Sequence, residues 1–322
     1  MRGRLSIQQV PAILPTLLFV ALFIVMVGVQ NEVSQPSLET VLETTLPLIL
    51  VGFGQSLVVM TGGIDLSVGG TMSLASAFLA THAVSNGDLV VWLPLVLVIG
   101  LAGGAVNGIL IVKTRIQPFI VTLASWSVFD GLALLVLPTE GGGVAPGLTK
   151  FVSGELAGIP KSLIFAVLVI LAWLVLRRTK FGLAVLAVGS DQASARLNGI
   201  NVDRTKVIVY ALSGLSAALA AIYYNGALTF SGSPTAGDPF ILLSVAAVVI
   251  GGTSLSGGRG SYLGTVLGAL SLSFISQIVF FAGAESYWSQ FLQGVLVLVA
   301  VALFSGVELL VKRRNPSAME EV

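Results

Sequence analysis

Long apolar segments are the feature that most restricts how this chain can fold. A helix that crosses a bilayer core needs about 20 apolar residues, and ten segments of the sequence approach or exceed that length. Only 10% of the residues are charged, against about 25% in an average soluble domain, so polar side chains cannot cover a water-soluble globule. We therefore expect an all-α, polytopic membrane protein with about ten transmembrane helices. The expected spans are 10–30, 40–60, 66–84, 89–112, 116–137, 161–176, 206–228, 239–253, 261–282 and 288–311.

The positions of lysine and arginine predict how these spans are oriented. With the N-terminus in the cytoplasm, the inner segments hold 14 of the 16 basic residues and the outer segments hold 2. Inner-membrane proteins have this asymmetry, and one miscounted span would invert the later loops and remove it. We therefore predict an even number of spans, two cytoplasmic termini and a cytoplasmic tail at 312–322. The inner residues are Arg2, Arg4, Lys113, Arg115, Arg177, Arg178, Lys180, Arg196, Arg204, Lys206, Arg259, Lys312, Arg313 and Arg314.

The loops leave no room for a soluble catalytic domain, so residues 1–322 are interpreted as one transmembrane domain. The outer loops 138–160 and 229–239 are rich in glycine and proline, which predicts irregular structure. The span at 239–253 is short, which indicates a tilted, broken or re-entrant helix.

Several kinds of chemistry are not supported by the sequence. The chain has no cysteine and one histidine, His82, which excludes disulfides, thiolate metal sites and a histidine-rich metal cluster. No GxxxxGK[ST] phosphate-binding loop occurs, so any ATP must be bound by another chain. We predict no catalytic residue, no metal site, no cofactor bound by this chain and no nucleic-acid partner.

A glycine-rich stretch, TGGIDLSVGG at 61–70, interrupts two expected spans. Gly62 and Gly63 suit the end of a helix, and Asp65 or Ser67 suits the start of the next one, where the helix dipole favours a carboxylate. This interpretation is architectural. The competing interpretation places Asp65 and Ser67 at a gate or substrate contact near the inner mouth of a pathway.

A second stretch, GGTSLSGGRG at 251–260, resembles the first at an offset of 189 residues. Transporters often contain internal repeats with interrupted helices, although glycine-rich loops also resemble one another without duplication. Both explanations remain open, and both stretches are expected on the cytoplasmic side. The matched positions are Gly62, Gly63, Leu66, Ser67 and Gly69 with Gly251, Gly252, Leu255, Ser256 and Gly258.

The inner segment 177–205 contains the signals of a short helix at 191–198. Ser190 or Asp191 suits its N-cap and Gly199 its C′ position, and Asn201 or Asp203 suits the cap of the following span. The polar residues of this helix either contact a partner protein or belong to a solvated loop. They are Gln192, Arg196 and Asn198.

The chain resembles the permease subunit of bacterial ABC importers for monosaccharides, the ribose, xylose and galactose class. The resemblance covers nearly the whole chain, with several long motifs in order. Besides TGGIDLSVGG, the motifs are KTRIQPFIVTLA (113–124), ARLNGINVDRTKVIVYALSG (195–214), PTAG (234–237) and AAVVIGGTSLSGGRGSYLGTVLGAL (246–270).

The resemblance implies a fold like that of the ten-helix type II importers and a location in the bacterial inner membrane. It implies three partners: a second permease, a periplasmic sugar-binding protein and a cytoplasmic ATPase that drives alternating access. The substrate would be a monosaccharide, with a pentose or furanose as our expectation. Segment 190–200 would be the coupling helix that docks on the ATPase, through Asp191, Gln192, Arg196, Asn198 and Gly199.

Three positions depart from the pattern of the family. Relatives commonly carry Glu at Gln192, Arg-Gly at Asp130-Gly131 and Glu-Leu-Asp at 241–243, where this chain has Ile-Leu-Leu. These changes favour pairing with a second, different permease over a homodimer, or an unusual substrate.

Six polar or aromatic residues are candidates for the substrate pathway. A carboxylate at the centre of a span costs about 2.5–3.5 kcal/mol on insertion scales, so Asp130 either faces the pathway or dimer interface or lies near the outer headgroups. The amides in the spans bind either a sugar or neighbouring helices, and Trp126 stacks on a sugar or contacts lipid. The candidates are Gln55, Asp65, Ser67, Asn107, Trp126 and Asp130.

The main alternative function is an ion-gradient-driven secondary transporter or channel for a small polar solute. Interrupted helices suit such a protein. Against it, the sequence lacks the paired intramembrane carboxylates expected for proton or sodium coupling, because Asp130 is the only deep acid predicted.

Overall fold

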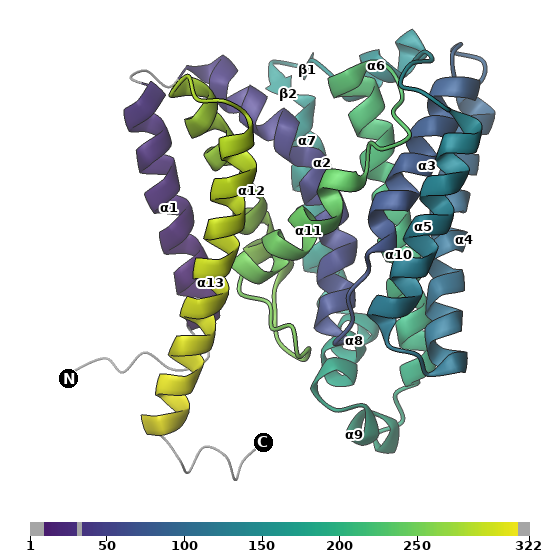
Figure 1. The fold of residues 1–322 in the computed structure, drawn as a ribbon. Coiled ribbons are helices and arrows are strands. Elements are labelled where there is room, and N and C mark those ends of the chain that lie inside the picture. The colour runs from purple at the N-terminus through teal and green to yellow at the C-terminus, as the bar shows by residue number, and fades with distance from the viewer. Residues whose placement is uncertain (1–9, 31–33, 315–322) are drawn as a thin grey trace.

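The computed structural model describes residues 10–30 and 34–314, most of which lie in helices (Figure 1). The longer helices are α1 (Val10–Gln30), α2 (Gln35–Met60), α3 (Ser67–His82), α4 (Leu89–Thr114), α5 (Pro118–Val136), α7 (Lys161–Leu176), α10 (Val202–Tyr223), α12 (Tyr262–Phe281) and α13 (Tyr287–Arg314). The shorter elements are α6 (Pro146–Val152), β1 (Glu155–Leu156), β2 (Ile159–Pro160), α8 (Lys180–Ser190), α9 (Gln192–Leu197), the π-helical turn η1 (Tyr224–Thr229) and α11 (Asp238–Ile250).

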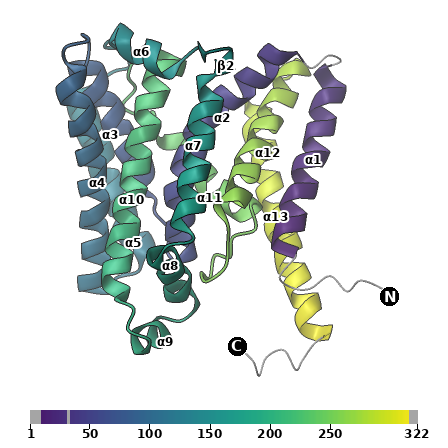
Figure 2. The ribbon, with the colours of Figure 1, turned by 180° about the vertical axis from the view of Figure 1, so that it is seen from behind.

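The helices form two groups, and α2 and α11 lie between them (Figure 1). Figures 1 and 2 show α1, α12 and α13 at one side and α3, α4, α5 and α10 at the other. Helix α2 packs against α10, α12, α11 and α7 and so joins the groups. The short α11 lies obliquely in the middle (Figure 1). The predicted inner elements α8 and α9 lie at one end of the molecule, and α6 with the two strands lies at the opposite end.

The all-α, polytopic prediction is confirmed in its main lines. Within the described residues, six helices are long and apolar enough to cross a membrane, or seven if α7 and α8, which are bent by 76°, form one span. Helices α3 and α11 are shorter, at 16 and 13 residues. The count of ten spans and the positions of the termini therefore remain predictions, and Arg2, Arg4 and 315–322 lie outside the described residues.

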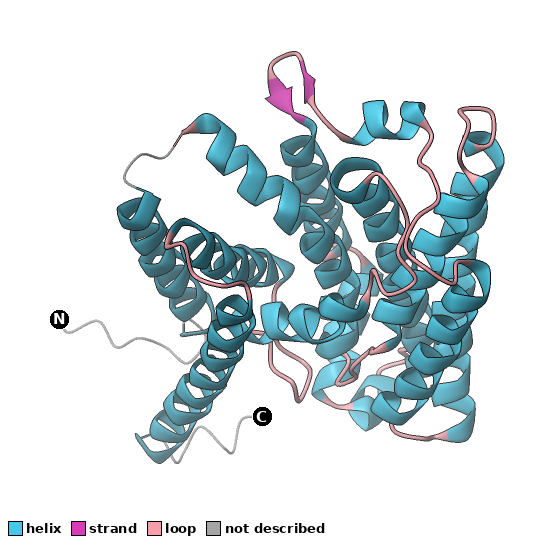
Figure 3. Cartoon of the chain, turned by 45° about the horizontal axis from the view of Figure 1, so that its top comes forward, coloured by secondary structure: helices cyan, strands magenta, loops and turns pink. Residues whose placement is uncertain are grey.

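The outer loop 138–160 was expected to be irregular, and this expectation is wrong in part. Pro146 stands in the first turn of α6, where its fixed φ is already helical. Beyond it, β1 and β2 pair antiparallel (Figure 3). Ala157 and Gly158 between them have φ of 53° and 77°, the left-handed pair of a two-residue hairpin turn.

The expected spans match the helices to within a few residues, except where polar caps extend them. Helix α2 begins at 35 because the Ser34 hydroxyl accepts the Ser37 N–H, and α10 begins at 202 because Asn201 accepts the Arg204 N–H at 2.9 Å. The inner segment holds two helices where one was expected. The missed helix, α8, begins where Thr179 accepts the Gly182 N–H at 3.1 Å.

The two glycine-rich stretches form the same kind of helix end. After α2, the N–H groups of Gly62 and Gly63 bond the carbonyls of residues 59 and 58 at 2.9 and 3.1 Å. After α11, those of Gly252 and Thr253 bond residues 249 and 248 at 2.9 and 3.2 Å. Gly62 and Gly252 have φ of 78° and 81°. The structural correspondence is thus an offset of 190 residues, one more than the sequence match.

Glycine also sets the distance between α4 and α10. A methyl group on Gly104 would overlap the Tyr210 carbonyl, and one on Gly214 would overlap the Gly100 carbonyl. Such small residues let helix backbones approach closely within a membrane, where packing replaces the hydrophobic effect as the driving force.

We expect Gly104→Leu to destabilise the chain by about 1–3 kcal/mol, the usual cost of overpacking, because α4 must move away from α10. Thermal unfolding of the purified protein in detergent measures this loss. The control is Gly28→Leu in α1, where no atom lies within 4 Å of the added carbon. Equal melting temperatures for Gly104→Leu and the wild type would contradict the described contact.

Candidate functional site

The start of α3 holds a buried chain of polar side chains. Asp65 Oδ1 accepts the Ser67 N–H at 2.9 Å and the Ser67 hydroxyl at 2.6 Å. Asn107 of α4 donates to Ser67 Oγ at 2.8 Å, and Ser125 of α5 donates to Asn107 Oδ1. These hydrogen bonds join α3, α4 and α5, so the Asn107 side chain bonds neighbouring helices. Asp65 stands one residue before Leu66, the N-cap of α3, and bonds the first N–H of that helix.

Asp65 also faces α10 with its second carboxylate oxygen. Oδ2 has no hydrogen-bond partner among the described residues, nor have the hydroxyls of Ser213 and Tyr210. Both hydroxyl groups lie near this carboxylate, and all three residues are buried. The contact of α10 with the start of α3 is therefore polar and incompletely bonded.

Two glycines of the first stretch bring three helices together in the next turn of α3. A methyl group on Gly69 would overlap Ile241 of α11, and one on Gly70 would lie 2.7 Å from the Trp126 carbonyl of α5. The start of α11 is fixed further because Ser73 Oγ accepts the Gly237 N–H at 3.0 Å. Helix α3 thus carries α5 on one side and the start of α11 on another.

This arrangement brings a second acid close to Asp130. Asp238, in the first turn of α11, lies near enough to Asp130 for their carboxylates to repel each other, and the Trp126 indole N–H lies near Asp238. One oxygen of each carboxylate and the indole nitrogen are buried atoms without a hydrogen-bond partner in the described part of the chain. We call Trp126, Asp130 and Asp238 the acidic cluster. A solute with hydroxyl groups, which both donate and accept hydrogen bonds, could satisfy it.

The six predicted pathway residues therefore fall into separate places. Asp65, Ser67 and Asn107 belong to one hydrogen-bonded chain, and Trp126 and Asp130 lie in the acidic cluster. Gln55 is buried in α2, and its amide atoms have no partner among the described residues. Sequence reasoning missed Asp238; its signal was an acid directly before a proline at the start of an apolar run.

No metal centre is found in the part of the chain that the structure describes. None of its histidine, aspartate and glutamate side chains form a group of three or more that could hold a metal ion.

Helix α9 is a capped turn at the end of the molecule that is predicted to face the cytoplasm. Asp191 accepts the Ala193 N–H at 2.9 Å and the Ser194 hydroxyl at 2.6 Å, and these bonds hold the pKa of its carboxyl below the usual value. Gly199, with φ of 80°, ends the helix, where its N–H bonds the Arg196 carbonyl. The predicted caps thus match the observed ones.

The polar residues of α9 are held by α10. Arg196 forms a 2.7 Å salt bridge with Asp203, and Lys206 donates to Gln192 at 3.1 Å. The Asn198 side chain instead bonds the Ser194 carbonyl at 2.9 Å, within α9 itself. These bonds orient α9 relative to the membrane helix that follows it.

One face of α9 is buried and the opposite face is exposed. Val188, Ala195 and Val202 form a small apolar core between α8, α9 and α10. Leu197, in contrast, is 89% exposed. Leu197 is the most exposed of the large hydrophobic side chains in the described part of the chain, so α9 presents an apolar group as well as polar ones. The sequence analysis overlooked Leu197, because it considered only the polar residues of this turn.

Helix α8 connects α9 to both glycine-rich turns. A methyl group on Gly189 would overlap the Met60 carbonyl and the Gly258 N–H, and that N–H donates to the Met60 carbonyl at 2.9 Å. A methyl group on Gly257 would lie 2.8 Å from the Gly62 nitrogen. We call these contacts of residues 60–62, 189 and 257–258 the glycine junction.

Known relatives of the chain are membrane permeases. The ribose import permease protein RbsC of Bacillus subtilis is 40% identical over 258 residues, 79% of this chain and 80% of that protein. RbsC of Escherichia coli K12 is 37% identical over 273 residues, 82% of this chain and 84% of its own length. The autoinducer 2 import system permease protein LsrD of Yersinia enterocolitica is 34% identical over 262 residues, 78% of each chain.

No solved structure matches the chain significantly. The predicted location, as a multi-pass protein of the bacterial inner membrane, agrees with the apolar helices and with these relatives. The model of one permease family matches residues 37–301. The chain therefore belongs to the family described as the branched-chain amino acid transport system / permease component.

Proposed function

We propose that this chain is the membrane-spanning subunit of an ATP-driven, binding-protein-dependent importer that moves a monosaccharide by alternating access. The observation that carries the proposal is α9, a capped turn with an exposed Leu197 that is anchored to both glycine-rich turns. A separate ATPase with a groove for this turn could move the membrane helices through it. The relatives named for ribose and autoinducer 2 import support the transport class.

The proposed coupling path runs from α9 through α8 to the glycine junction. A displacement of Gly189 would push on the Met60 carbonyl and on Gly258, because no space separates them. The first of these contacts leads into the start of α3, and the second leads back to α11. Both helices border the acidic cluster, so a push at the cytoplasmic end would reach the proposed pathway.

The acidic cluster is the proposed substrate contact, and its charge favours a sugar over an amino acid. Carboxylates accept hydrogen bonds from hydroxyl groups, and the Trp126 ring offers an apolar face for a sugar ring. All lysines and arginines in the described part lie in loops or at helix ends. An amino acid substrate would therefore meet two carboxylates with no cation to pair with its own carboxylate.

The importer would contain three further components. We propose a cytoplasmic ATPase at α9, a periplasmic sugar-binding protein at the opposite end and a second permease, with a heterodimer favoured. The substitutions at Gln192, Asp130 and 241–243 motivate the heterodimer. In α11, Ile241 is buried against Gly69 and Leu242 is 74% exposed, so Leu242 offers an apolar surface to a neighbour.

Reconstitution of the complete importer tests the proposed function. We expect uptake into vesicles only when the ATPase, ATP and the binding protein are present, with ribose as the first substrate to try. Uptake that persists without the ATPase and stops when the ion gradient collapses would support the secondary-transporter alternative instead. The purified complex also tests the heterodimer, because two copies of this chain without a second permease would refute it.

We expect Arg196→Glu and Leu197→Asp to uncouple ATP hydrolysis from transport, because each introduces a carboxylate at the proposed docking face. The measurement is ATP hydrolysed per solute transported by the reconstituted importer. Lys113→Glu, an exposed charge reversal at the end of α4, is the control. If both α9 variants transport with the wild-type ratio, the docking assignment is wrong.

We expect Asp130→Asn and Asp238→Asn each to raise the KM for solute uptake about 10-fold or more, because a hydrogen bond to a charged group contributes about 1.5–3 kcal/mol. The assay is the concentration dependence of ATP-driven uptake. Glu155→Gln, in the exposed outer hairpin, is the matched neutralisation. An unchanged KM in both variants would remove the acidic cluster from the pathway.

A further inference from the structure

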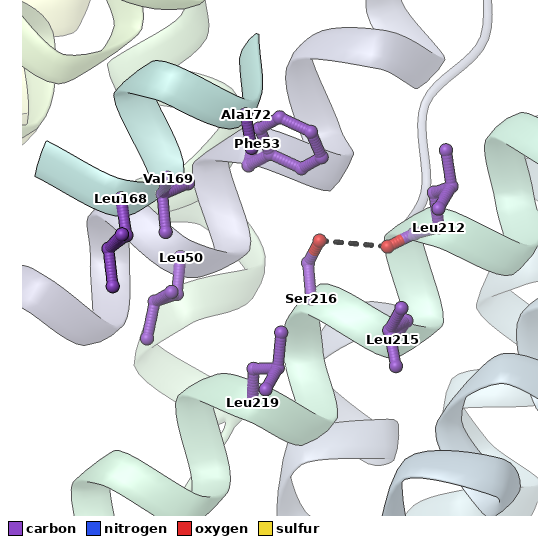
Figure 4. A pocket seen from close by; sticks show the side chains of 9 residues that line it. All are labelled: Leu50, Phe53, Leu168, Val169, Ala172, Leu212, Leu215, Ser216 and Leu219. Atoms are coloured by element: carbon purple, nitrogen blue, oxygen red, sulfur yellow. Dashed lines mark hydrogen bonds between the residues drawn. The ribbon is translucent and has the colours of Figure 1, made fainter. Parts of the chain in front are cut away.

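An apolar groove of about 210 Å³ opens between α2, α7 and α10. Figure 4 shows its side chains, which are leucine, valine, alanine, phenylalanine and one serine. The Ser216 hydroxyl is already used, because it donates to the Leu212 carbonyl at 2.8 Å. The groove therefore offers no free polar group. Its lining residues are Leu50, Phe53, Leu168, Val169, Ala172, Leu212, Leu215, Ser216 and Leu219.

The groove lies on an apolar outer face of the molecule. Figure 2 shows α7 and α10 side by side on the side opposite to α5 and α13 in Figure 1. Leu168 and Leu219, which line the groove, are 54% and 39% exposed. Val175, on the same helix as Leu168, is 67% exposed. At this depth in a membrane the neighbours are lipid acyl chains or apolar side chains of another protein.

A basic segment follows α7, one of the three helices that line the groove. Arg177, Arg178 and Lys180 follow α7 directly and are exposed, and none of them has a side-chain hydrogen bond or ion pair in the described structure. The segment 161–190 contains no aspartate or glutamate. Ala172 and Leu168 lie four and eight residues before Leu176, which is about 6 and 12 Å along a helix. The unpaired charges therefore lie one to two helical turns below the groove.

The charges also argue against a second copy of this chain as the occupant. In a two-fold symmetric contact the same patch meets itself, so a groove-to-groove contact would place three basic residues near three more. An anionic ligand with an apolar tail matches both parts of the site. Its tail suits the apolar groove, and its negative charge suits the three basic residues. Phospholipids with a net negative headgroup have this chemistry, and basic clusters at the cytoplasmic ends of membrane helices attract them.

We propose that this groove binds one acyl chain of an anionic phospholipid, and that Arg177, Arg178 and Lys180 hold its phosphate-bearing headgroup. The site requires only that α7 and α10 are embedded in a membrane. It does not depend on which solute the protein transports.

Native mass spectrometry of the full chain tests the proposal, after reconstitution in nanodiscs that contain phosphatidylglycerol and phosphatidylcholine. We expect the wild type to retain phosphatidylglycerol in preference to phosphatidylcholine. Ala172→Trp, which fills the groove, should reduce retention at least fivefold. Replacing Arg177, Arg178 and Lys180 by Gln should reduce the preference by about fivefold per charge.

Two controls match these variants. Leu171→Trp adds the same ring to an exposed position of α7 that does not line the groove, and it should retain lipid like the wild type. Lys113→Gln with Arg115→Gln removes exposed charge at the end of α4. Equal retention of the two lipids by the wild type would overturn the proposal. So would an unchanged preference after the triple Gln replacement, or equal lipid retention by Ala172→Trp and the wild type.

Discussion

Unsatisfied backbone groups at helix interruptions are the constraint on which this structure depends. Lipid offers no hydrogen bonds, so non-helical backbone is tolerated in a membrane only where protein or water covers it. In the described part of the chain, such interruptions follow α2 and α11. Each interruption supplies a hydrogen-bond partner to the other. The Gly258 N–H, which follows α11, donates to the Met60 carbonyl at the end of α2. This bond needs backbones in contact, which explains why glycine stands at 189, 257 and 258.

The same close packing gives the fold its mechanical properties. Where a side chain separates two elements, rotamer changes can absorb a small displacement, whereas backbone in contact with backbone cannot yield without moving. The glycine junction and the contact of Gly69 with Gly237, the N-cap of α11, are of the second kind. A displacement of α8 would therefore be passed to α3 and α11, with little of it absorbed by side-chain rotation. In the proposed importer, a six-residue turn such as α9 would act on much larger helices through these contacts.

Sequence reasoning predicted what depends on local signals and missed what depends on tertiary contacts. The spans, the Asp191 cap and the Gly199 end of α9 follow from apolar length and capping chemistry. Helix α8 was missed because its apolar residues lie at the membrane end of a segment that was classified by its charges. The hairpin after α6 was missed because its turn uses Ala157, a residue without a turn signal. The proximity of Asp238 to Asp130 could not be predicted, because it depends on the contacts of α3 with both α11 and α5.

The two polar centres of the molecule differ in how many of their hydrogen bonds are satisfied. Ser67 and Asn107 are buried and bonded to their neighbours, so a ligand there would first have to break bonds that hold three helices together. Asp130 and Asp238 belong to a cluster whose buried polar atoms lack partners among the described residues. A buried polar atom without a partner costs about 1–3 kcal/mol, and a passing solute that donates hydrogen bonds would relieve that cost. Incomplete bonding alone does not mark a transport contact, because the Asp65 Oδ2 atom beside Ser213 and Tyr210 also lacks a partner in the described part of the chain. The acidic cluster differs in that two carboxylates lie close enough to repel each other there.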